Sequence, residues 1–294
     1  MFRLAQVSDP HFQSFRNVKL RDLFGKRALG GLNLLLMRRR KHNMALLQSL
    51  LKDLPSRGVD HLAITGDLCN IALESEWAAA LRWIEATQIP SERVTVIPGN
   101  HDAYVAKVVD DGVFERMFAP YQTAELRAGS AIYPFVRFRD DVALVCTSTG
   151  VPTGDTGAWG RMGEPQLTRL ESLLTAPEVK RRRRVVLIHH PPLVNRHGEE
   201  RNLRDRAALQ ALLARTGADL VLHGHDHRDY FNELPGPDGT RIPVVGAGSA
   251  SYDGPPDRRA RYNVFEIDKT SLTLITYAHD SATDKFGEFA RRTL

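Results

Sequence analysis

Seven side chains that can bind metal ions follow apolar segments of this sequence, in the turns where those segments end. The clearest case is Ala63-Ile64-Thr65-Gly66-Asp67, an apolar run that stops at a glycine and is followed by a carboxylate. The other candidates are Asp9, His11, Asn100, His189, His225 and His227. In an open α/β sheet the loops at the carboxyl ends of the strands share one crevice, so these residues are expected to form one site. The pattern therefore restricts the chain to folds whose strands end together.

Strand-like and helix-like segments alternate along most of the chain. Strands are predicted at 2–8, 59–65, 93–97, 142–147, 185–188 and 219–222, and amphipathic helices at 43–54, 74–88, 166–175 and 205–215. Later runs at 242–245, 262–267 and 272–277 alternate like antiparallel strands. The order predicts an α/β sandwich in one domain, 1–294. Residues 103–139 are expected to wrap over the sheet, 151–163 to form a loop and 180–184 a basic turn.

Composition is that of a water-soluble globular protein, with 294 residues, 42% hydrophobic and 26% charged. The longest apolar stretch near the N-terminus, 32–37, is far shorter than the roughly 20 residues that a bilayer requires. The chain begins directly with a strand pattern and shows no signal-peptide pattern, so a cytoplasmic location is expected. Cys69 and Cys146 lack the paired spacing of disulfide or zinc-knuckle proteins and are expected to be buried.

The candidate ligands have the donor atoms of a transition-metal site. Asp9-x-His11 offers a carboxylate and an imidazole from one turn, and His225-x-His227 offers two imidazoles. Mixed oxygen and nitrogen ligands without thiolates suit Mn, Fe or Zn better than Mg or Ca. Two ions about 3.5–4 Å apart, bridged by a carboxylate, can hold a hydroxide and clamp a phosphoryl group. The sequence therefore predicts a dinuclear centre in which Asp67 is the bridge.

The order of these motifs resembles the signature of the calcineurin-like metallophosphoesterase superfamily. The motifs are Asp9-Pro10-His11, Gly66-Asp67, Gly99-Asn100-His101-Asp102, His189-His190-Pro191 and Gly224-His225-Asp226-His227. The resemblance implies a four-layer α/β/β/α sandwich with mixed sheets. It implies one metal ion held by Asp9, His11, Asp67 and His227, and a second held by Asp67, Asn100, His189 and His225.

The resemblance also implies catalytic roles for two residues beside the ligands. In relatives the histidine that matches His101 stabilises the phosphoryl group or protonates the leaving oxygen, and an imidazole suits this task because its pKa lies near neutral pH. Asp102 is expected to orient His101. The attacking group would be the metal-bridging hydroxide. His190 and His223 adjoin ligands and are interpreted as residues that support the ligands or pack beside them.

Several substrates fit the resemblance. The chain looks most similar to the bacterial class III cyclic nucleotide phosphodiesterase-like branch, which implies cleavage of a phosphodiester. An alternative is a lipid-linked pyrophosphate, as for the UDP-diacylglucosamine hydrolases, although these carry an arginine where this chain has His101. A nuclease is a further option, but no segment predicts a duplex-binding groove. A non-catalytic metal-binding scaffold is the alternative from another class, and the complete set of ligands counts against it.

A basic segment follows the first motif. Residues 16–41 contain nine lysines or arginines and one acid, Asp22, whereas the whole chain carries a net charge of +5, so the remainder is net negative. Leucines at roughly helical spacing predict an amphipathic helical insertion at about 13–42. It is interpreted as a solvated surface, a lid, or a contact with an anionic membrane surface or a phosphate-rich partner.

Overall fold

The computed structural model describes residues 1–14, 27, 41–153, 157–194 and 198–294. Thirteen strands in this part of the chain form two mixed sheets. The first contains β1 (Phe2–Val7), β2 (His61–Ile64), β3 (Val94–Val96), β11 (Arg261–Ile267), β12 (Leu272–Asp280) and β13 (Lys285–Thr293). The second contains β4 (Leu126–Arg127), β5 (Phe135–Arg139), β6 (Val142–Cys146), β7 (Arg183–Leu187), β8 (Leu220–His223), β9 (Tyr230–Pro235) and β10 (Arg241–Gly246).

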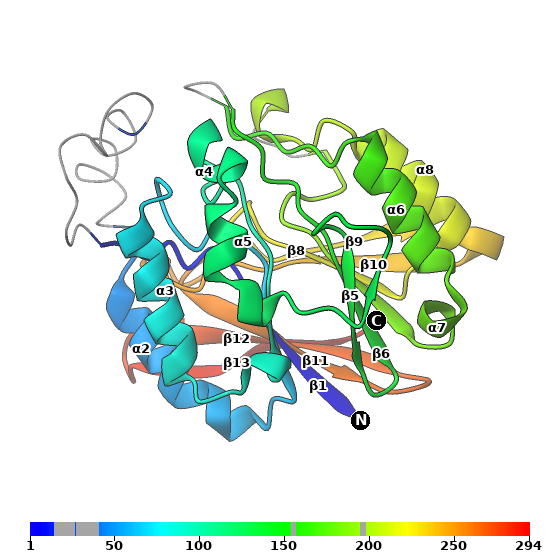
Figure 1. Cartoon of the computed structure of the whole chain (residues 1–294). Helices are drawn as coiled ribbons and strands as arrows, with labels where there is room; N and C mark the ends of the chain where they lie inside the picture. The colour runs from blue at the N-terminus through cyan, green and yellow to red at the C-terminus, as the bar shows by residue number, and fades with distance from the viewer. Residues whose placement is uncertain (15–26, 28–40, 154–156, 195–197) are drawn as a thin grey trace.

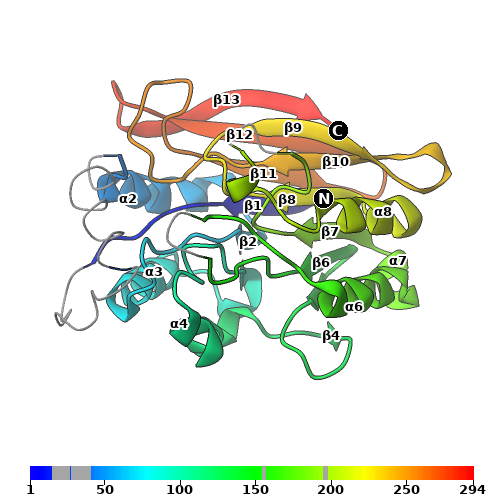
Figure 2. The same cartoon turned by 90° about the horizontal axis from the view of Figure 1, so that it is seen from above.

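Helices flank both sheets. The first sheet is accompanied by α2 (Met44–Asp53), α3 (Glu74–Ala86), α4 (Ala106–Asp110) and α5 (Val113–Met117), and the second by α6 (Glu164–Thr175), α7 (Pro177–Lys180) and α8 (Arg206–Thr216). Short 3-10 turns lie at Leu54–Arg57, Ser91–Arg93, Ala119–Tyr121, Glu199–Arg201 and Pro237–Gly239. In both views α2 and α3 lie on one side of the sheets and α6 to α8 on the other (Figures 1 and 2).

The two-residue period of the strands creates the layers. In β6, Val142 and Leu144 belong to the core between the two sheets, whereas Ala143 and Val145 pack with α6 and α8. In β1, Leu4 faces the core between the sheets and Ala5 packs with α2 and α3. Because layers cover both faces of each sheet, most residues of the central strands β1, β2, β7 and β8 are buried. The four-layer α/β/β/α sandwich predicted from the sequence is confirmed.

Parallel pairing brings the strand ends together. The first sheet has the order β13-β12-β11-β1-β2-β3, and β1, β2 and β3 are mutually parallel. The second has the order β4-β5-β6-β7-β8-β10-β9, in which β6, β7 and β8 are parallel. The candidate ligands therefore follow β1, β2 and β3 of one sheet and β7 and β8 of the other. They meet along one end of the sandwich.

The structure differs from the sequence prediction in several segments. Residues 103–139 do not simply wrap over the sheet, because they form α4, α5, the edge strand β4 and its neighbour β5. The basic turn at 180–184 is reduced to two residues between α7 and β7. Strand β10 pairs parallel with β8 and antiparallel with β9, so the 242–245 run is only partly antiparallel. Strands β9 and β13 were not predicted. The single-domain organisation stays a prediction.

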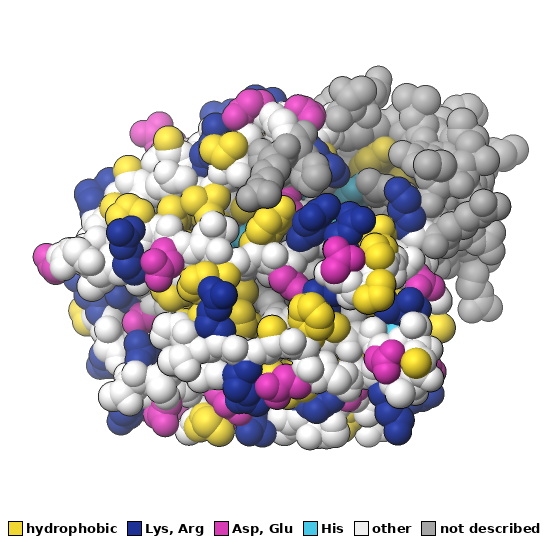
Figure 3. Space-filling model, turned by 180° about the vertical axis from the view of Figure 1, so that it is seen from behind, with side chains coloured by type: hydrophobic (Ala, Val, Ile, Leu, Met, Phe, Trp, Pro, Cys, Tyr) yellow, Lys and Arg dark blue, Asp and Glu magenta, His cyan; other side chains and the backbone are white. Residues whose placement is uncertain are grey.

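The predicted basic insertion lies outside the described residues, apart from its two ends and Arg27. The Arg27 guanidinium donates hydrogen bonds to the carbonyl oxygens of Ile71 (3.0 Å) and Ala72 (2.5 Å), in the loop after β2. On the face shown in Figure 3, basic and acidic side chains are interspersed where the chain is described. This distribution agrees with a net charge that is concentrated in residues 16–41.

Candidate metal centre

The turns that carry the candidate ligands have unusual backbone conformations. Asp9, His11, Asp67, His225 and His227 all have positive φ, between 46° and 72°. This left-handed region is uncommon for residues other than glycine. The amides of Asp9 and His11 donate to the carbonyl oxygens of Gly66 and Asp67, each at 3.1 Å. These two bonds hold the turns after β1 and β2 against each other.

Two glycines leave room for the ligands. A Cβ added to Gly99 would lie 2.2 Å from Asp67 Oδ1, and one added to Gly66 would lie 2.5 Å from His189 Nδ1. Contacts below 3.0 Å do not occur at real Cβ atoms, so neither position accepts a side chain without movement. Gly66 also has a φ of +96°. Both glycines of the Gly66-Asp67 and Gly99-Asn100 motifs are therefore required by the packing of the site.

One group of ligands gathers around Asp9. Single donor atoms of Asp9, His11, Asp67 and His227 all lie within 4.8 Å of one another. His227 Nε2 is 3.2 Å from Asp9 Oδ1, and His11 Nε2 is 3.9 Å from Asp67 Oδ2. The two carboxylates and His11 are buried, while the His227 side chain is 30% exposed. This group can hold a metal ion and leaves one side open to solvent.

A second group gathers around His189. Donor atoms of Asp67, His189 and His225 lie within 4.8 Å of one another. Asn100 Oδ1 lies 3.2 Å from His189 Nε2 and 2.9 Å from His225 Nδ1. His189 Nε2 is also 3.4 Å from Asp67 Oδ1. The structure thus brings all seven sequence-predicted ligands into two adjoining groups that share Asp67.

Hydrogen bonds to backbone carbonyls orient three of the imidazoles. His11 Nδ1 lies 3.0 Å from the Cys69 oxygen, His189 Nδ1 lies 2.8 Å from the Thr65 oxygen, and His225 Nε2 lies 3.0 Å from the Arg201 oxygen. A carbonyl only accepts, so these nitrogens carry the proton. The opposite nitrogens of His11 and His225 then have lone pairs directed at the carboxylates or Asn100, and that of His189 has one once its second proton is released. Metal-binding histidines in proteins are held in this way, so the donor set fits transition-metal ions.

The charges in the site also suit a cation. Burial opposes ionisation of Asp67, but the charges of His189 and His101 hold its pKa well below the ordinary value, so it is a carboxylate. Burial, with neighbouring histidines, lowers the pKa of His11 and of His225 well below 6.5, so both rings are neutral. Burial acts against protonation of His189, yet Asp67 raises its pKa to about 10. Binding of a cation beside Asp67 must therefore release this proton.

His101 and Asp102 follow the Asn100 ligand. His101 donates its backbone N–H to Asp67 Oδ1 at 2.8 Å, and its ring Nδ1 lies 2.5 Å from the Asn70 oxygen. The Asp102 carboxylate accepts hydrogen bonds from the indole of Trp77 and from three backbone amides, those of Leu68, Cys69 and Gly99. Asp102 therefore ties the loops after β2 and β3 together.

The neighbouring histidines and cysteines are packed as interpreted from the sequence. His190 Nδ1 lies 2.8 Å from Thr149 Oγ1, and His223 Nδ1 lies 3.0 Å from the Gly224 oxygen. Both rings are buried. Cys69 and Cys146 are free thiols with no exposure, which confirms the prediction. Burial raises the pKa of both thiols, so neither is a ready thiolate ligand.

One residue of the site was missed by the sequence interpretation. His42 lies after the basic segment, and a ring nitrogen of His42 lies within 4.8 Å of ring nitrogens of His11 and His227. Its position follows no predicted strand. The only signal in the sequence was a histidine at the end of an insertion that begins beside His11.

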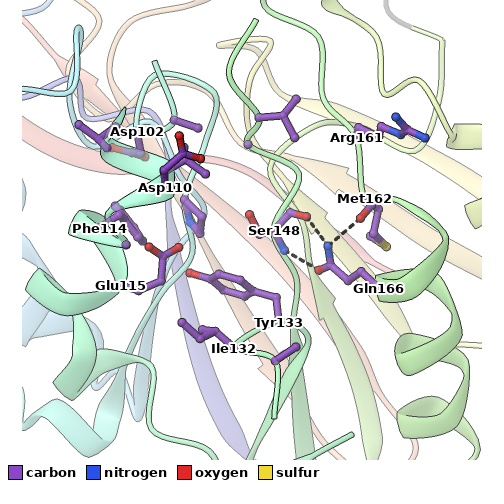
Figure 4. A pocket seen from close by; sticks show the side chains of 18 of the residues that line it. Asp102, Asp110, Phe114, Glu115, Ile132, Tyr133, Ser148, Arg161, Met162 and Gln166 are labelled. Atoms are coloured by element: carbon purple, nitrogen blue, oxygen red, sulfur yellow. Dashed lines mark hydrogen bonds between the residues drawn. The ribbon is translucent and has the colours of Figure 1, made fainter. Parts of the chain in front are cut away.

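A cavity of about 480 Å³ lies beside the loop that carries Asn100 (Figure 4). Phe114, Ile132 and Tyr133 form part of its apolar lining, and Glu115 and Arg161 contribute charges. None of the seven candidate ligands lines it. A Cβ added to Gly150 would lie 2.5 Å from the Gly99 oxygen, so the two backbones touch between the cavity and the ligands. The loop that carries Asn100 therefore lies between the cavity and the metal centre.

The family model described as calcineurin-like phosphoesterase matches residues 2–229. The chain belongs to the calcineurin-like phosphoesterase family. It is accordingly a metal-dependent phosphohydrolase by family. The family has a dinuclear metal centre, and the His/Asp groups described above could hold metal ions.

Solved structures share the fold of this calcineurin-like phosphoesterase. A dimetal phosphatase from Danio rerio has a TM-score of 0.63 at 13% identity, covering 99% of this chain and 98% of that one. The purple acid phosphatase PPD1 from yellow lupin has a TM-score of 0.60 at 16% identity. The match covers 98% of this chain but only 52% of the lupin enzyme, so this chain matches about half the length of that protein. GAP50, the anchor in the inner membrane complex of Plasmodium, has a TM-score of 0.57 at 11% identity. The match covers 100% of this chain and 88% of GAP50.

No curated protein sequence matches this calcineurin-like phosphoesterase. Among its described residues, no helix has the length and apolar character needed to cross a bilayer.

Proposed function

We propose that this chain hydrolyses a phosphodiester with the help of two transition-metal ions, Mn, Fe or Zn. Asp9, His11, Asp67 and His227 would hold one ion, and Asp67, Asn100, His189 and His225 the other. Bound in this way, the ions would supply an activated hydroxide and neutralise charge on the phosphoryl group.

The observation that carries this proposal is the placement of the Asp67 carboxylate. Its Oδ2 faces His11 Nε2 at 3.9 Å, and its Oδ1 faces His189 Nε2 at 3.4 Å. The two oxygens therefore face different groups of ligands, as a bridging carboxylate requires. The His101 amide also donates to Oδ1 and fixes the orientation of the carboxylate.

Residues around the ligands would position the substrate and move its proton. The hydrogen bond from Nδ1 to Asn70 orients the ring of His101, whose centroid lies 5.0 Å from that of His11. Nε2 of His101 is then the nitrogen that would meet a phosphoryl or leaving-group oxygen. Asp102 would keep the His101 loop in place through its bonds to backbone amides rather than through the ring.

The favoured substrate is a cyclic nucleotide-like or other diester, as in the class III cyclic nucleotide phosphodiesterase-like branch. A pyrophosphate at a membrane surface is the second candidate. It is supported by the two ends of the basic insertion, which meet beside His11, where Gln13 Nε2 donates to the His42 oxygen at 3.2 Å. An anionic surface bound by residues 16–41 would then lie close to the ligands. A cytoplasmic location stays a prediction.

A scaffold without activity is the alternative from another class. GAP50, described as an anchor, has a similar fold, so the fold alone does not favour catalysis. The complete set of seven ligands, with His101 beside them, supports the hydrolase instead.

Steady-state assays of the Mn-loaded protein on bis-p-nitrophenyl phosphate and on p-nitrophenyl phosphate would test the proposal. We expect metal-dependent turnover, faster on the diester, and a loss of more than about 100-fold in Asp67→Asn. Absence of turnover in a protein that binds two ions would favour the scaffold. Cyclic nucleotides and lipid-linked pyrophosphates, compared side by side, would separate the two substrate candidates.

A further inference from the structure

His42 is fixed at the metal centre by contacts that lie far apart in the sequence. Its ring Nδ1 lies 2.8 Å from Ser251 Oγ, and its backbone forms an isolated antiparallel bridge with Tyr252. Its carbonyl oxygen accepts a hydrogen bond from Gln13 Nε2. The residue is only 5% exposed. Three contacts to two separate segments therefore determine where this imidazole points.

The imidazole points at the first group of ligands. The ring centroid of His42 lies 4.6 Å from that of His11, with the planes at 61°, and 5.5 Å from that of His227, with the planes at 87°. One ring nitrogen of each of these three histidines lies within 4.8 Å of the other two. His42 thus adds a third imidazole beside His227, on the side of the site that is partly open to solvent.

The geometry argues against His42 as another ligand of the same ion. Donor atoms of Asp9, His11, Asp67 and His227 fall within one 4.8 Å group, but the group that contains His42 includes neither carboxylate. Ligands of one ion, with bonds of about 2.0–2.2 Å, lie no more than about 4.4 Å apart. His42 therefore lies outside the set of ligands of this ion, where its side chain can contact a molecule bound to the ion.

We propose that His42 is a substrate-binding residue that donates a hydrogen bond from Nε2–H to a phosphoryl oxygen lying between His11 and His227. This inference rests on the phosphohydrolase function proposed above. A diester phosphate offers only acceptor oxygens, so the residue beside it must be a donor. The Ser251 hydroxyl can donate to Nδ1 of His42, which leaves the proton on Nε2. Such a donor stabilises an anionic oxygen that is bound next to a metal ion.

Variants of His42 test the proposal. His42→Ala removes the donor, His42→Gln retains an N–H donor, and His61→Gln is a matched control. His61 is another fully buried histidine bonded to a hydroxyl, with Nε2 2.8 Å from Thr95 Oγ1, but it lies in β2 away from the ligands. Metal content and affinity, phosphate binding to the Mn-loaded protein by calorimetry, and steady-state kinetics on bis-p-nitrophenyl phosphate would be measured for each.

We expect His42→Ala to bind two ions as the wild type does. Its phosphate affinity and kcat/KM should both fall about 10- to 100-fold, and His42→Gln should recover part of each loss. His61→Gln should change neither beyond any loss of folded protein. Unchanged phosphate affinity in His42→Ala, or the loss of one ion, would overturn the proposal. If His42→Ala does not fold, the phosphate affinities of the wild type, His42→Gln and His42→Phe test the proposal instead. Phenylalanine keeps a ring but has no hydrogen-bond donor.

The two proposals can fail separately. A wild-type protein that binds two ions but never hydrolyses an ester would refute the proposed function. Calorimetry with phosphate would still measure whether His42 contacts an anion bound to the ions.

Discussion

The Nε2 atoms of His11 and His227 face each other at a distance of 3.0 Å. The proton of the His11 ring is on Nδ1, which is bonded to the Cys69 oxygen, so its Nε2 offers a lone pair. Two ring nitrogens this close need a proton or a cation between or beside them. Asp9 Oδ1, 3.2 Å from His227 Nε2, adds negative charge at the same point. This arrangement is suited to a bound metal ion and leads to the first prediction.

Removal of metal should destabilise the protein. Ions that bind only the folded state stabilise it by about 3 kcal/mol when present at 100 times their Kd. We therefore expect the Tm measured by scanning fluorimetry to fall by several degrees after treatment with EDTA and dialysis, and to recover with Mn(II). Equal Tm values for the loaded and the stripped protein would contradict a metal centre at these residues.

Replacement of the shared carboxylate should cost both ions. Asp67 contacts both groups of ligands, whereas Asp9 belongs only to the group with His11 and His227. Asp67→Ala should therefore lose both ions together, and Asp9→Ala should mainly weaken one. Metal content determined by mass spectrometry, with titration calorimetry, distinguishes these results. Loss of a single ion in both variants would show that Asp67 is not the bridge.

A methyl group at Gly99 should damage the site. Its carbon would lie 2.2 Å from Asp67 Oδ1 and 2.8 Å from His189 Cε1, so the loop that carries Asn100 must shift. We expect Gly99→Ala to weaken binding of an ion at least about 10-fold, because misplaced ligands and supporting residues typically cost that much. Gly287→Ala is the control, since a Cβ at Gly287 has no neighbour within 4 Å. Similar metal affinities in the two variants would contradict this prediction.

Stability should fall with rising pH through the titration of Glu76. Burial raises the pKa of this carboxyl from 4.5 to about 7, although the amides of Ile71 and Leu73 donate to it. The folded chain therefore holds the proton more tightly than the unfolded chain. The stability that Glu76 contributes is complete below pH about 4.5 and is lost as the pH rises through about 7, by roughly 3 kcal/mol.

Urea unfolding at several pH values would measure this effect. At pH 4.5 the free energy of unfolding of Glu76→Gln should be no higher than that of the wild type. By pH 8 it should have risen relative to the wild-type value, because an amide does not ionise. A difference between the two proteins that does not change with pH would refute the assignment to Glu76.

The ligands could be predicted because their positions depend on local sequence. Asp67, Asn100 and His189 each follow an apolar strand, and parallel strands must end together. His42 could not be predicted in the same way. It follows a run of basic residues, and it is placed by Ser251, 209 positions away in the chain. No periodic pattern in one sequence reports a contact of that kind.

Two of the missed strands, β13 and β5, lack the alternation of apolar and polar residues for different reasons. In β13 only Phe286 is buried, so the strand shows no alternation of apolar and polar residues. In β5 the fully buried position 137 is an arginine, whose guanidinium donates to the carbonyl oxygens of Ser91, Glu92, Val94 and Tyr121. A charged residue in a core position conceals the strand pattern. Residues of 103–139 and of the predicted loop 151–163 contribute to opposite walls of the cavity in Figure 4.

The positive φ angles of five ligands have a consequence for protein engineering. A residue other than glycine in this conformation costs of order 1 kcal/mol or more, and Asp9, His11, Asp67, His225 and His227 all bear this cost. A ligand replaced by glycine should therefore yield a more stable chain than the same ligand replaced by alanine. Selection of variants for heat resistance alone, without metal, would remove these side chains early. Selection of a more thermostable variant of this protein must therefore include selection for metal binding.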